Sequence, residues 1–600
     1  MPINDKSLIM IIDIYKYTVF STAAFVKGLW FKLFLAFTLL CVSQTVFAST
    51  EINEVVKSEI SLPELKNSND DPTSFGTKLS KILVINDRIN GAAIQSRSGL
   101  SGIHSLIDDQ AGGQVNMSRY LNRFLNQPMS FRLINQIKAE IVRVYQVNNL
   151  PLVSVAVPPQ EVSDGGLQIN ITPFVVGEVI VKGNKRYSTS FLSSQINLKP
   201  GELVSTNQLR QDLDWLAKNP FRNIQASFKP GSDYGTTNVI LNVFEKEKLW
   251  TVALGGSNSG TAATNKNRMF LGFSVGDLIN TDDNFSYTGI IDPKNFAARQ
   301  FIDINGRKGF LSHQFGYATP VNLYGKRARL KVGGQFLSTI SQTGSSSFQA
   351  HSRTTLLNSE LNSPIDKWVG SFSLMPELYG RLEVKNSSKV KLFNFNRPDT
   401  NSTKSNLTLL PLGMRGATSG TLFGVKSSGN FDVSWVFGRG ADAGVKKPTF
   451  GYLGWTLRQN FNLSPDLIFA VKSNGQYTRN PLPSLAQSSI GGDSSVRGYA
   501  AGEISTERGV VLNFEFKSKM IKSKFGDIPV KTIPYTFFDA GYASALGTRK
   551  AINISSGGLG LDVTVGKSSV LKWSLARAFR PGLLTVKDSV GAHLSFVARF

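Results

Sequence analysis

One cation and one carboxylate in the second half of the chain stand in settings that favour a long-range charge pair. The cation, Arg497, lies in the glycine-containing stretch Gly-Gly-Asp-Ser-Ser-Val-Arg-Gly-Tyr at residues 491–499. The carboxylate, Asp539, lies in the apolar segment Phe-Phe-Asp-Ala-Gly at residues 537–541. A guanidinium can bind a carboxylate through two parallel hydrogen bonds, which fixes position as well as charge. The two segments therefore predict a long-range charge pair between a loop and a strand, although an isolated Arg-Gly-Tyr is also typical of a surface turn.

Residues for catalysis and for metal or cofactor binding are sparse in this sequence. The single cysteine is Cys41, and the four histidines (His104, His313, His351 and His593) are far apart along the chain. The sequence contains no Gly-x4-Gly-Lys-Ser/Thr, His-Glu-x-x-His or Gly-x-Ser-x-Gly motif. We therefore predict no catalytic residue, no metal site and no cofactor, with a barrel enzyme such as a surface protease or lipase as an alternative.

The positive charge of the chain is concentrated after residue 248. The chain carries 66 Lys and Arg against 42 Asp and Glu, a formal net charge of +24. Residues 249–600 hold 41 of the basic and 21 of the acidic residues, so a surplus of 20 lies there. The charges are spaced singly among glycine, serine and aromatic residues, which suits a barrel better than a nucleic-acid surface. We predict no nucleic-acid partner, and we hypothesise a cationic lumen that suits neutral or acidic substrates.

The first 48 residues are typical of a secretory signal peptide. Lys27 and Lys32 precede the apolar run at residues 33–40, and Val-Phe-Ala at residues 46–48 fits a cleavage site. The run is short for a membrane-spanning helix, which needs about 20 apolar residues, although an inner-membrane anchor is the alternative. We expect cleavage after Ala48 and no membrane-spanning helix in the mature chain.

Residues 49–79 are expected to hold one short amphipathic helix and a linker. Ile52, Val55, Val56 and Ile60 fall on one face of a helix, and Pro63 ends the pattern. A single helix of this length is marginal in water, so a frayed N-terminus is an open alternative.

Residues 80–248 are expected to form two small modules, 80–173 and 174–248, each with the order β-α-α-β-β. Leu133, Ile137 and Ile141 recur at helical spacing, whereas Leu167 and Ile169 alternate as in a strand. The expected elements of the first module are strand 81–85, helices 117–125 and 131–147, and strands 152–157 and 167–172. Those of the second module are strand 179–182, helices 191–196 and 205–219, and strands 224–228 and 239–244.

Residues 249–600 are typical of a transmembrane antiparallel β-barrel of about 16 strands. Helical periodicity disappears there, and short alternating segments are separated by Gly, Asn, Ser and Asp clusters. In the last segment Ala592, Leu594, Phe596, Ala598 and Phe600 share one face, which is the lipid-out, lumen-in alternation of a barrel strand. A barrel strand with its turn or loop takes roughly 20 residues, and 352 residues divided by 16 gives 22. An even number near 16 therefore fits, and about 14 or 18 strands would also fit. A soluble β-sandwich is the alternative.

The chain resembles the outer-membrane transporters of two-partner secretion, the TpsB proteins related to haemolysin and filamentous-haemagglutinin secretors. The resemblance covers a short N-terminal helix, a linker, two POTRA modules and a barrel, and this family's barrels have 16 strands. Its most specific elements are two motifs, a loop tip and a barrel-wall acceptor. The loop-tip residues are Gly491, Gly492, Val496, Arg497, Gly498 and Tyr499, and the acceptor residues are Phe537, Asp539 and Gly541.

The resemblance implies a role for each of these residues. Arg497 is expected at the tip of the long sixth extracellular loop, folded back into the barrel onto Asp539. Gly498 lets the backbone pass close to the wall, the two glycines at 491–492 permit a sharp turn, and Tyr499 packs beside the strand. The helix at residues 51–62 would be a removable plug, and Phe600 would be the C-terminal signal read by the barrel-assembly machinery.

The predicted function is an outer-membrane pore of a Gram-negative bacterium that secretes one large, dedicated exoprotein. The POTRA modules are expected in the periplasm, where an edge strand can accept the unfolded partner as an added strand. The predicted partners are this exoprotein, outer-membrane lipid and the barrel-assembly machinery. An assembly or insertion factor of the same superfamily is the alternative, and a passive porin or adhesin is a weaker one.

Overall fold

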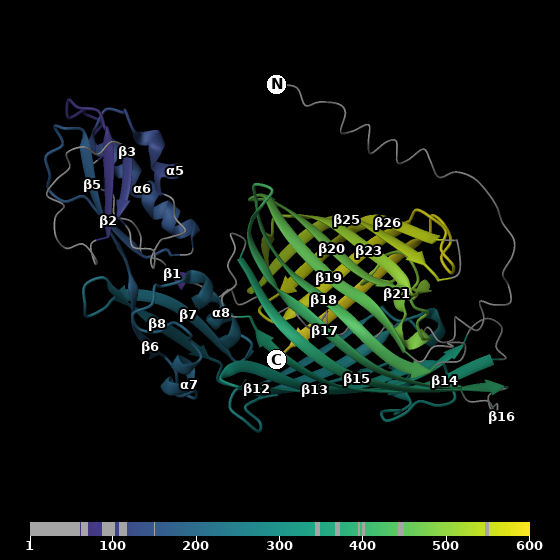
Figure 1. The fold of residues 1–600 in the computed structure, drawn as a ribbon. Helices are drawn as coiled ribbons and strands as arrows, with labels where there is room; N and C mark the ends of the chain where they lie inside the picture. Colours follow the sequence, from purple (N-terminus) through teal and green to yellow (C-terminus); the bar gives the residue numbers. More distant parts are fainter. Residues whose placement is uncertain are drawn as a thin grey trace.

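Two small α/β modules, each with a four-stranded sheet, lie beside one end of a closed β-barrel (Figure 1). The computed structural model describes residues 60–61, 70–86, 102–106, 117–148, 150–342, 348–365, 373–393, 397–398, 403–441, 449–546 and 551–600. The signal peptide expected at residues 1–48 lies outside these ranges. None of the helices in the described ranges has the length and apolarity needed to cross a bilayer.

The first module is a four-stranded sheet in the order β3-β2-β5-β4. Its elements are β2 (Lys81–Asn86), β3 (Gly102–Leu106), α5 (Met117–Leu121), the 3-10 turn η2 (Asn122–Phe124), α6 (Phe131–Val147), β4 (Val153–Ala156) and β5 (Gly166–Pro173). The expected order β-α-α-β-β is present, and β3 is an additional edge strand parallel to β2. The sequence of β3, Gly-Ile-His-Ser-Leu, shows too little alternation to predict a strand.

The long helix α6 holds the first module together. Its N-cap is Ser130, whose side chain accepts a hydrogen bond from the backbone N–H of Leu133 at 3.2 Å. Ile137 and Ile141 follow at helical spacing and are completely buried in one core with Ile169 of β5. The apolar residues at helical spacing in α6 and at alternating positions in β5 therefore pack in the same core.

The second module is a four-stranded sheet in the order β1-β7-β8-β6. Its elements are β1 (Ile60–Ser61), β6 (Val175–Lys182), α7 (Thr189–Ser194), α8 (Thr206–Leu216), β7 (Arg222–Pro230) and β8 (Thr236–Glu245). Ser205 is the N-cap of α8 and accepts a hydrogen bond from the backbone N–H of Gln208 at 3.3 Å. Strands β7 and β8 form the expected antiparallel pair.

The end of the expected N-terminal helix is a strand. Ile60 and Ser61 form β1, which runs parallel to β7 opposite Ala226 and Ser227. A helix that continues to residue 62 is therefore wrong at these two positions, and residues 51–59 of that helix lie outside the described ranges. The backbone groups at the edge of β7 hold this segment extended, which overrides the helical spacing of its apolar residues.

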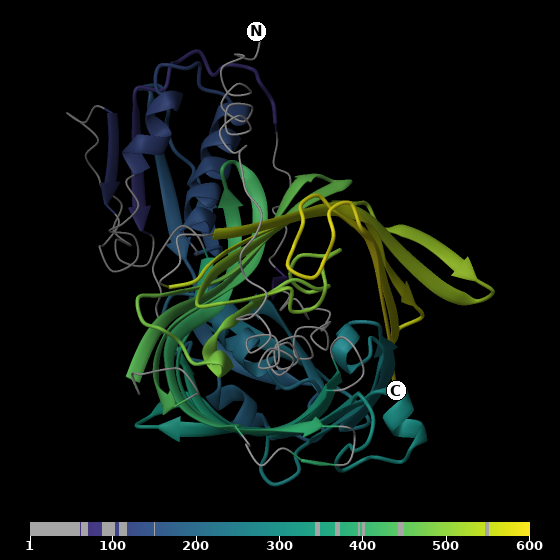
Figure 2. The same ribbon diagram turned by 90° about the vertical axis from the view of Figure 1, so that its right-hand side faces the viewer.

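The barrel consists of sixteen full-length antiparallel strands in the part of the chain that the structure describes, as the sequence predicts. They are β9 (Trp250–Ser257), β10 (Arg268–Gly276), β11 (Asn284–Ile291), β12 (Gly309–Leu323), β13 (Lys326–Gln342), β14 (Phe348–Pro364), β15 (Ser373–Phe393), β17 (Thr403–Leu422), β18 (Val425–Ala441), β19 (Thr449–Ser464), β20 (Leu467–Thr478), β23 (Arg508–Ser518), β25 (Ile528–Ser544), β26 (Ala551–Val565), β27 (Ser569–Ala578) and β28 (Val590–Arg599). The short strands β16 (Arg397–Pro398) and β24 (Ile521–Phe525) only extend two of the hairpins. Figure 2 shows the strands as a closed wall.

The two faces of the barrel wall differ in polarity. Phe315 of β12 and Leu357 of β14 are exposed and lie opposite the same residue of β13, Gly334, so they share one face of the wall. Charged residues such as Arg381 and Glu383 of β15 have the opposite parity to the exposed Leu378 and Leu382. The apolar face is the lipid side and the charged face is the lumen.

The last strand closes the ring against the first. Strand β28 pairs with β9 from Ser595 to Arg599, opposite Ser257 to Ala253. Phe600 continues this pairing, because its N–H donates to the carbonyl of Val252 at 2.9 Å and its carbonyl accepts from the N–H of Val252 at 3.1 Å. The chain therefore ends as part of the wall, and the side chain of Phe600 is mostly exposed.

Candidate loop anchor and module joint

The segment between β20 and β23 folds back onto the inner face of the barrel wall. Its two ends pair in a short hairpin of β21 (Ser488–Ile490) and β22 (Ile504–Thr506). The segment then packs its apolar residues against lumen-facing side chains of β23, β25, β26 and β27, among them Val511, Ala543 and Ile554. Residues 491–503, between the two strands of the hairpin, form the tip of this loop.

The tip is held by Arg497, whose guanidinium forms a bidentate hydrogen-bonded ion pair with Asp539 of β25. Nε donates to Oδ2 and Nη2 donates to Oδ1, each at 2.8 Å. The backbone N–H of Arg497 also donates to Oδ2 at 3.0 Å, and Asn513 Nδ2 of β23 donates to Oδ1 at 2.8 Å. Asp539 is completely buried, so these four donors replace the water that a free carboxylate would bind.

A second carboxylate and an aromatic ring complete the surroundings of the guanidinium. Nη1 of Arg497 donates to Glu515 of β23 at 2.8 Å, and Lys517 lies 3.0 Å from the other oxygen of Glu515. The ring of Phe537 lies 3.5 Å from the guanidinium carbon, in the geometry of a cation–π contact. Two cations and two carboxylates therefore balance in charge at the loop tip.

Glycine is required where the tip approaches the wall and where the loop turns. Gly498 has φ +85°, and a Cβ there would lie 3.1 Å from Ala576 of β27. Gly491 and Gly492 have φ of +111° and +98°, and a Cβ on Gly491 would lie 2.6 Å from the carbonyl oxygen of Ala500. A Cβ on Gly541 would come within 3.0 Å of loop side chains, so both sequence motifs supply room for close contact.

Tyr499 and Glu503 tie the same loop to the segment between β27 and β28. The Tyr499 hydroxyl donates to the carbonyl of Arg580 at 2.7 Å. Glu503 Oε1 accepts from the backbone N–H groups of Leu584 at 2.6 Å and Thr585 at 2.9 Å. The loop is therefore attached at two levels, by Arg497 at its tip and by Tyr499 and Glu503 after it.

The structure places the predicted site residues in two groups. Arg497, Gly498, Val496, Tyr499, Asp539, Phe537 and Gly541 meet at one part of the wall, with Gly491 and Gly492 at the entry turn. Phe600 is apart from them, at the pairing of the last strand with the first. Sequence reasoning missed Asn513, Glu515 and Glu503. The alternation of Val511, Asn513 and Glu515 within one strand was the available signal for the first two.

Buried charges also join the second module to the near end of the barrel. Asp282, in the turn between β10 and β11, lies 2.8 Å from Arg222 of β7 and 3.2 Å from Arg329 of β13. Asn219 Nδ2 donates to Asp282 Oδ1 at 2.7 Å. All of these side chains are buried. We call this group the module joint.

A second ion pair lies next to the module joint. Arg327 of β13 lies 2.6 Å from Asp212 of α8, and it also donates to the carbonyl of Gln195 at 2.9 Å. Burial raises the pKa of Asp212 to about 6, although Arg327 opposes the shift. Lys218 pairs with Glu377 of β15 and lies 4.4 Å from the ring centre of Trp215. The second module is therefore docked on the barrel rim through several paired charges.

The inner wall across the ring from the loop tip carries a ladder of paired charges. Glu360 of β14 lies 2.6 Å from Arg415, 2.8 Å from Arg381 and 3.2 Å from Lys331. Arg381 also lies 3.0 Å from Glu383. In this group three cations, Arg415, Arg381 and Lys331, pair with two carboxylates, Glu360 and Glu383, so every cation has a carboxylate partner and one positive charge remains.

Ser338, His351 and Asp303 have the residue types of a catalytic triad but not its geometry. Ser338 Oγ lies 3.1 Å from His351 Nε2, and Asp303 Oδ1 lies 3.5 Å from the same nitrogen. In a triad the acid holds the other ring nitrogen, and Ser338 is completely buried. Within the described ranges no group of three or more His, Cys, Asp or Glu is arranged to hold a metal ion.

Three family models match this chain. The model described as haemolysin secretion/activation protein ShlB/FhaC/HecB matches residues 399–563, which include Arg497 and Asp539. A POTRA domain model of ShlB type matches residues 106–173. A POTRA model described as surface antigen variable number repeat matches residues 174–246.

Two known proteins of similar sequence are named as transporters, and two solved structures have a similar fold. The heme/hemopexin transporter protein HuxB of Haemophilus influenzae strain 86-028NP is 22% identical over 491 residues, which are 77% of this chain and 80% of HuxB. The outer membrane transporter CdiB-2 of Burkholderia pseudomallei is 26% identical over 165 residues, 28% of this chain and 27% of CdiB-2. The solved structure of CdiB from Escherichia coli matches with a TM-score of 0.63 and 14% identity, covering 97% of this chain and all of that one. CdiB from Acinetobacter baumannii gives 0.59 and 16%, covering 96% and 100%.

Breaking the loop anchor should destabilise the barrel. Arg497→Ala leaves Asp539 buried without its counter-charge, so we expect a loss of about 3–5 kcal/mol in the free energy of unfolding. Asp539→Ala should cost a similar amount, and the double variant should cost clearly less than the sum. Urea titration of the purified barrel in micelles measures these values. The control is Arg577→Ala, whose exposed pair with Asp588 should contribute about 0–1 kcal/mol. If the loss of stability in the double variant equals the sum of the losses in the two single variants, Arg497 and Asp539 are not coupled.

Removing Asp282 should loosen the module joint. Asp282→Ala leaves Arg222 and Arg329 buried without a carboxylate, which should cost about 3–5 kcal/mol of docking free energy. Spin labels at residues 229 and 426 would report this as a broader distance distribution between module and barrel. Asp466→Ala removes only an exposed pair with Lys519 and should leave the distribution unchanged. An unchanged distribution in both variants would show that the buried charges do not hold the joint.

Proposed function

We propose, from the premise that this chain belongs to the two-partner secretion outer-membrane transporters, that it exports one large exoprotein captured as an unfolded chain. In this proposal the POTRA modules lie in the periplasm, and the barrel loops at the opposite end face the outside. The exoprotein binds the modules, passes the barrel in extended form and folds outside the cell. The sequence contains no ATP-binding P-loop motif. Folding of the exoprotein outside the cell would therefore drive its export in one direction.

The observation that carries the capture step is the pairing of β1 with β7. An extended segment of the chain itself lies parallel to β7, and its described residues pair as Ile60 with Ala226 and Ser61 with Ser227. Ile60 packs against the core of the second module. An edge that accepts one extended segment by backbone pairing can accept another. We therefore assign the β7 edge to the incoming exoprotein, which would displace β1.

The loop tip has a positioning role in this proposal. Arg497 keeps residues 491–503 against β23, β25 and β27, so the loop lies along one side of the lumen. The charge ladder around Glu360 lines the other side. An extended polypeptide would then pass between an anchored loop and a wall of paired charges with a positive surplus, which offers polar contacts and suits neutral or acidic segments.

The remaining predicted partners belong to assembly of the barrel. Phe600 is the proposed C-terminal signal for the barrel-assembly machinery, supported by its place at the end of the last strand beside β9. Lipid surrounds the apolar face of the wall. The plug role concerns residues 51–62, of which only Ile60 and Ser61 are described.

An assembly factor is the alternative function, and the match to a secretion/activation model over residues 399–563 favours export.

Deletion of the gene in the producing bacterium tests the export function. We expect one large protein to disappear from the medium while other outer-membrane proteins keep their abundance, as measured by quantitative proteomics. Complementation with Arg497→Ala should give an inserted barrel but reduce export at least about tenfold, because the loop tip loses its anchor. Broad loss of outer-membrane proteins would instead indicate an assembly factor, and normal export by Arg497→Ala would reject a working role for the loop tip.

Locking β1 onto β7 tests the capture edge. The variant Ser61→Cys/Ser227→Cys places two cysteines at directly paired positions. Under oxidising conditions we expect export to fall below about one tenth of the unmodified level, because the occupied edge cannot pair with the exoprotein. A reductant should restore export, and the two single-cysteine variants control for Cys41 and for the substitutions. Full export from the oxidised double variant would assign capture to another surface.

A further inference from the structure

The segment between β11 and β12 runs across the outer face of the barrel. This segment, residues 293–304, is called the strap here and begins with the short helix α9 (Pro293–Ala297). Its backbone carbonyl at Phe301 contacts His313 Nε2 of β12 at 2.7 Å. Asp303 accepts a hydrogen bond from Ser338 of β13 and from Arg353 Nε of β14 at 2.8 Å. The strap therefore crosses three neighbouring strands.

The side chains under the strap belong to the lipid side of the wall. His313 lies two residues from the exposed Phe315, and Arg353 lies four residues from the exposed Leu357, so strand alternation puts each pair on one face. Ile304 is completely buried in a cluster with Leu311 and Ile340. Because Leu311 has the parity of His313 and Phe315, this cluster also lies outside the lumen.

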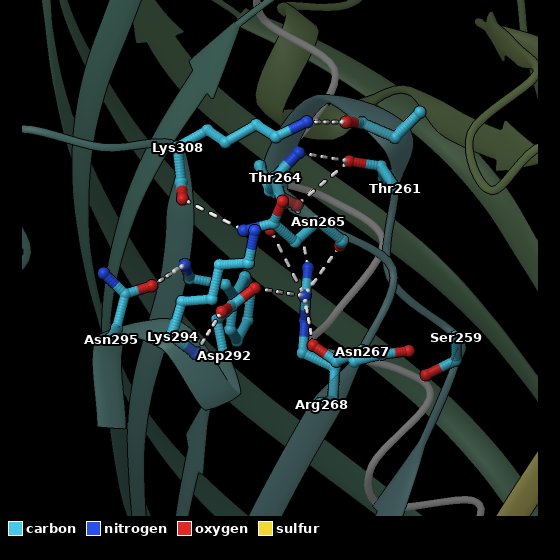
Figure 3. Close-up of polar contacts among 12 residues, drawn as sticks. Ser259, Thr261, Thr264, Asn265, Asn267, Arg268, Asp292, Lys294, Asn295 and Lys308 are labelled. Atoms are coloured by element: carbon cyan, nitrogen blue, oxygen red, sulfur yellow. Dashed lines mark hydrogen bonds and ion pairs between the residues drawn. The ribbon is translucent and has the colours of Figure 1, made fainter. Parts of the chain in front are cut away.

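The base of the strap is fixed by a buried polar group at the distal end of β10 and β11 (Figure 3). Asp292 caps α9 by accepting a hydrogen bond from the N–H of Lys294 at 2.7 Å, and it lies 3.9 Å from Arg268. Arg268 also donates to the carbonyl oxygens of Asn265 and Asn267 at 2.8 and 2.9 Å. The strap is thus held at its base and at Ile304, so its outward surface has a defined position.

The outward surface of the strap combines exposed apolar and cationic side chains. Phe296, Phe301 and Ile302 are 50, 46 and 83% exposed, and the two rings meet edge to face at 5.5 Å. Three exposed cations, Lys294, Arg299 and Arg307, stand in and beside the strap. The carboxylates of this region are engaged, since Asp292 is buried and Asp303 binds Arg353.

We propose that the strap binds a phosphorylated glycolipid of the outer leaflet. The apolar surface continues the lipid-facing band of Phe315 and Leu357, so its occupant is lipid rather than water. Phe296, Phe301 and Ile302 contact the acyl chains, and Lys294, Arg299 and Arg307 bind the phosphate groups above them. The inference rests on the proposed orientation, in which this end of the barrel faces outside, but not on which cargo is exported.

Native mass spectrometry of the full-length protein in micelles tests this proposal. The probes are bisphosphorylated lipid A, lipid A with its phosphates removed, phosphatidylcholine and inorganic phosphate. We expect the protein to retain bisphosphorylated lipid A at least about tenfold more than the dephosphorylated form. The variant K294Q/R299Q/R307Q should lose this preference. The control K426Q/K522Q/K524Q removes the same charge from exposed positions at the opposite rim and should keep it.

Several outcomes would overturn the proposal. It fails if the protein shows no phosphate preference, if both triple variants lose it equally, or if inorganic phosphate alone displaces lipid A, which would indicate a simple anion site. Retention of lipid A by the strap variant together with lost export would assign the surface to a protein partner. The variant F301S/I302S should weaken retention of lipid A but keep the preference for the bisphosphorylated form. An unheated gel that shows the compact barrel confirms that each variant is folded.

Discussion

The buried carboxylate of Asp539 constrains the whole second half of the structure. A completely buried anion is stable only if donors replace its hydration, and here four donors reach it from the loop tip and from β23. Three of them come from one residue, Arg497. The loop tip must therefore return to the same point on the wall, and the glycines that permit close approach are required by that return.

The anchor also links parts of the barrel that are far apart in sequence. Through Arg497 the loop contacts β23 and β25, and through Tyr499 and Glu503 it contacts the segment before β28. Gly498 donates its backbone N–H to His593 on β28 at 3.3 Å, next to the pairing that closes the ring. The module joint has a similar arrangement at the rim next to the second module, where Asp282 is buried between Arg222 and Arg329. The inner wall and this rim thus each contain a buried aspartate that organises neighbouring elements.

Local patterns in the sequence predicted the features that depend on local spacing. The faces of α6 and the alternation of the last strand follow from periodicity, whereas chain length limited the strand number only to an even value near 16. The Arg497–Asp539 pair could be proposed because each partner lies in a distinctive short motif. The module joint and the strap could not, since their partners come from separate elements that meet only through strand register and docking. The strand at Ile60 and Ser61 differs from the expected helix because an edge of another module determines its conformation.

In the membrane-embedded protein, Arg497 holds the loop tip at the wall through its contact with Asp539. A distance measurement between spin labels at residue 494 on the tip and residue 426 on the near rim, made in lipid bilayers, tests it most directly. We expect one narrow distance distribution for the native chain and a broad distribution or a second population for Arg497→Ala. An identical narrow distribution in both proteins would contradict it, because the loop would then be held without the buried charge pair.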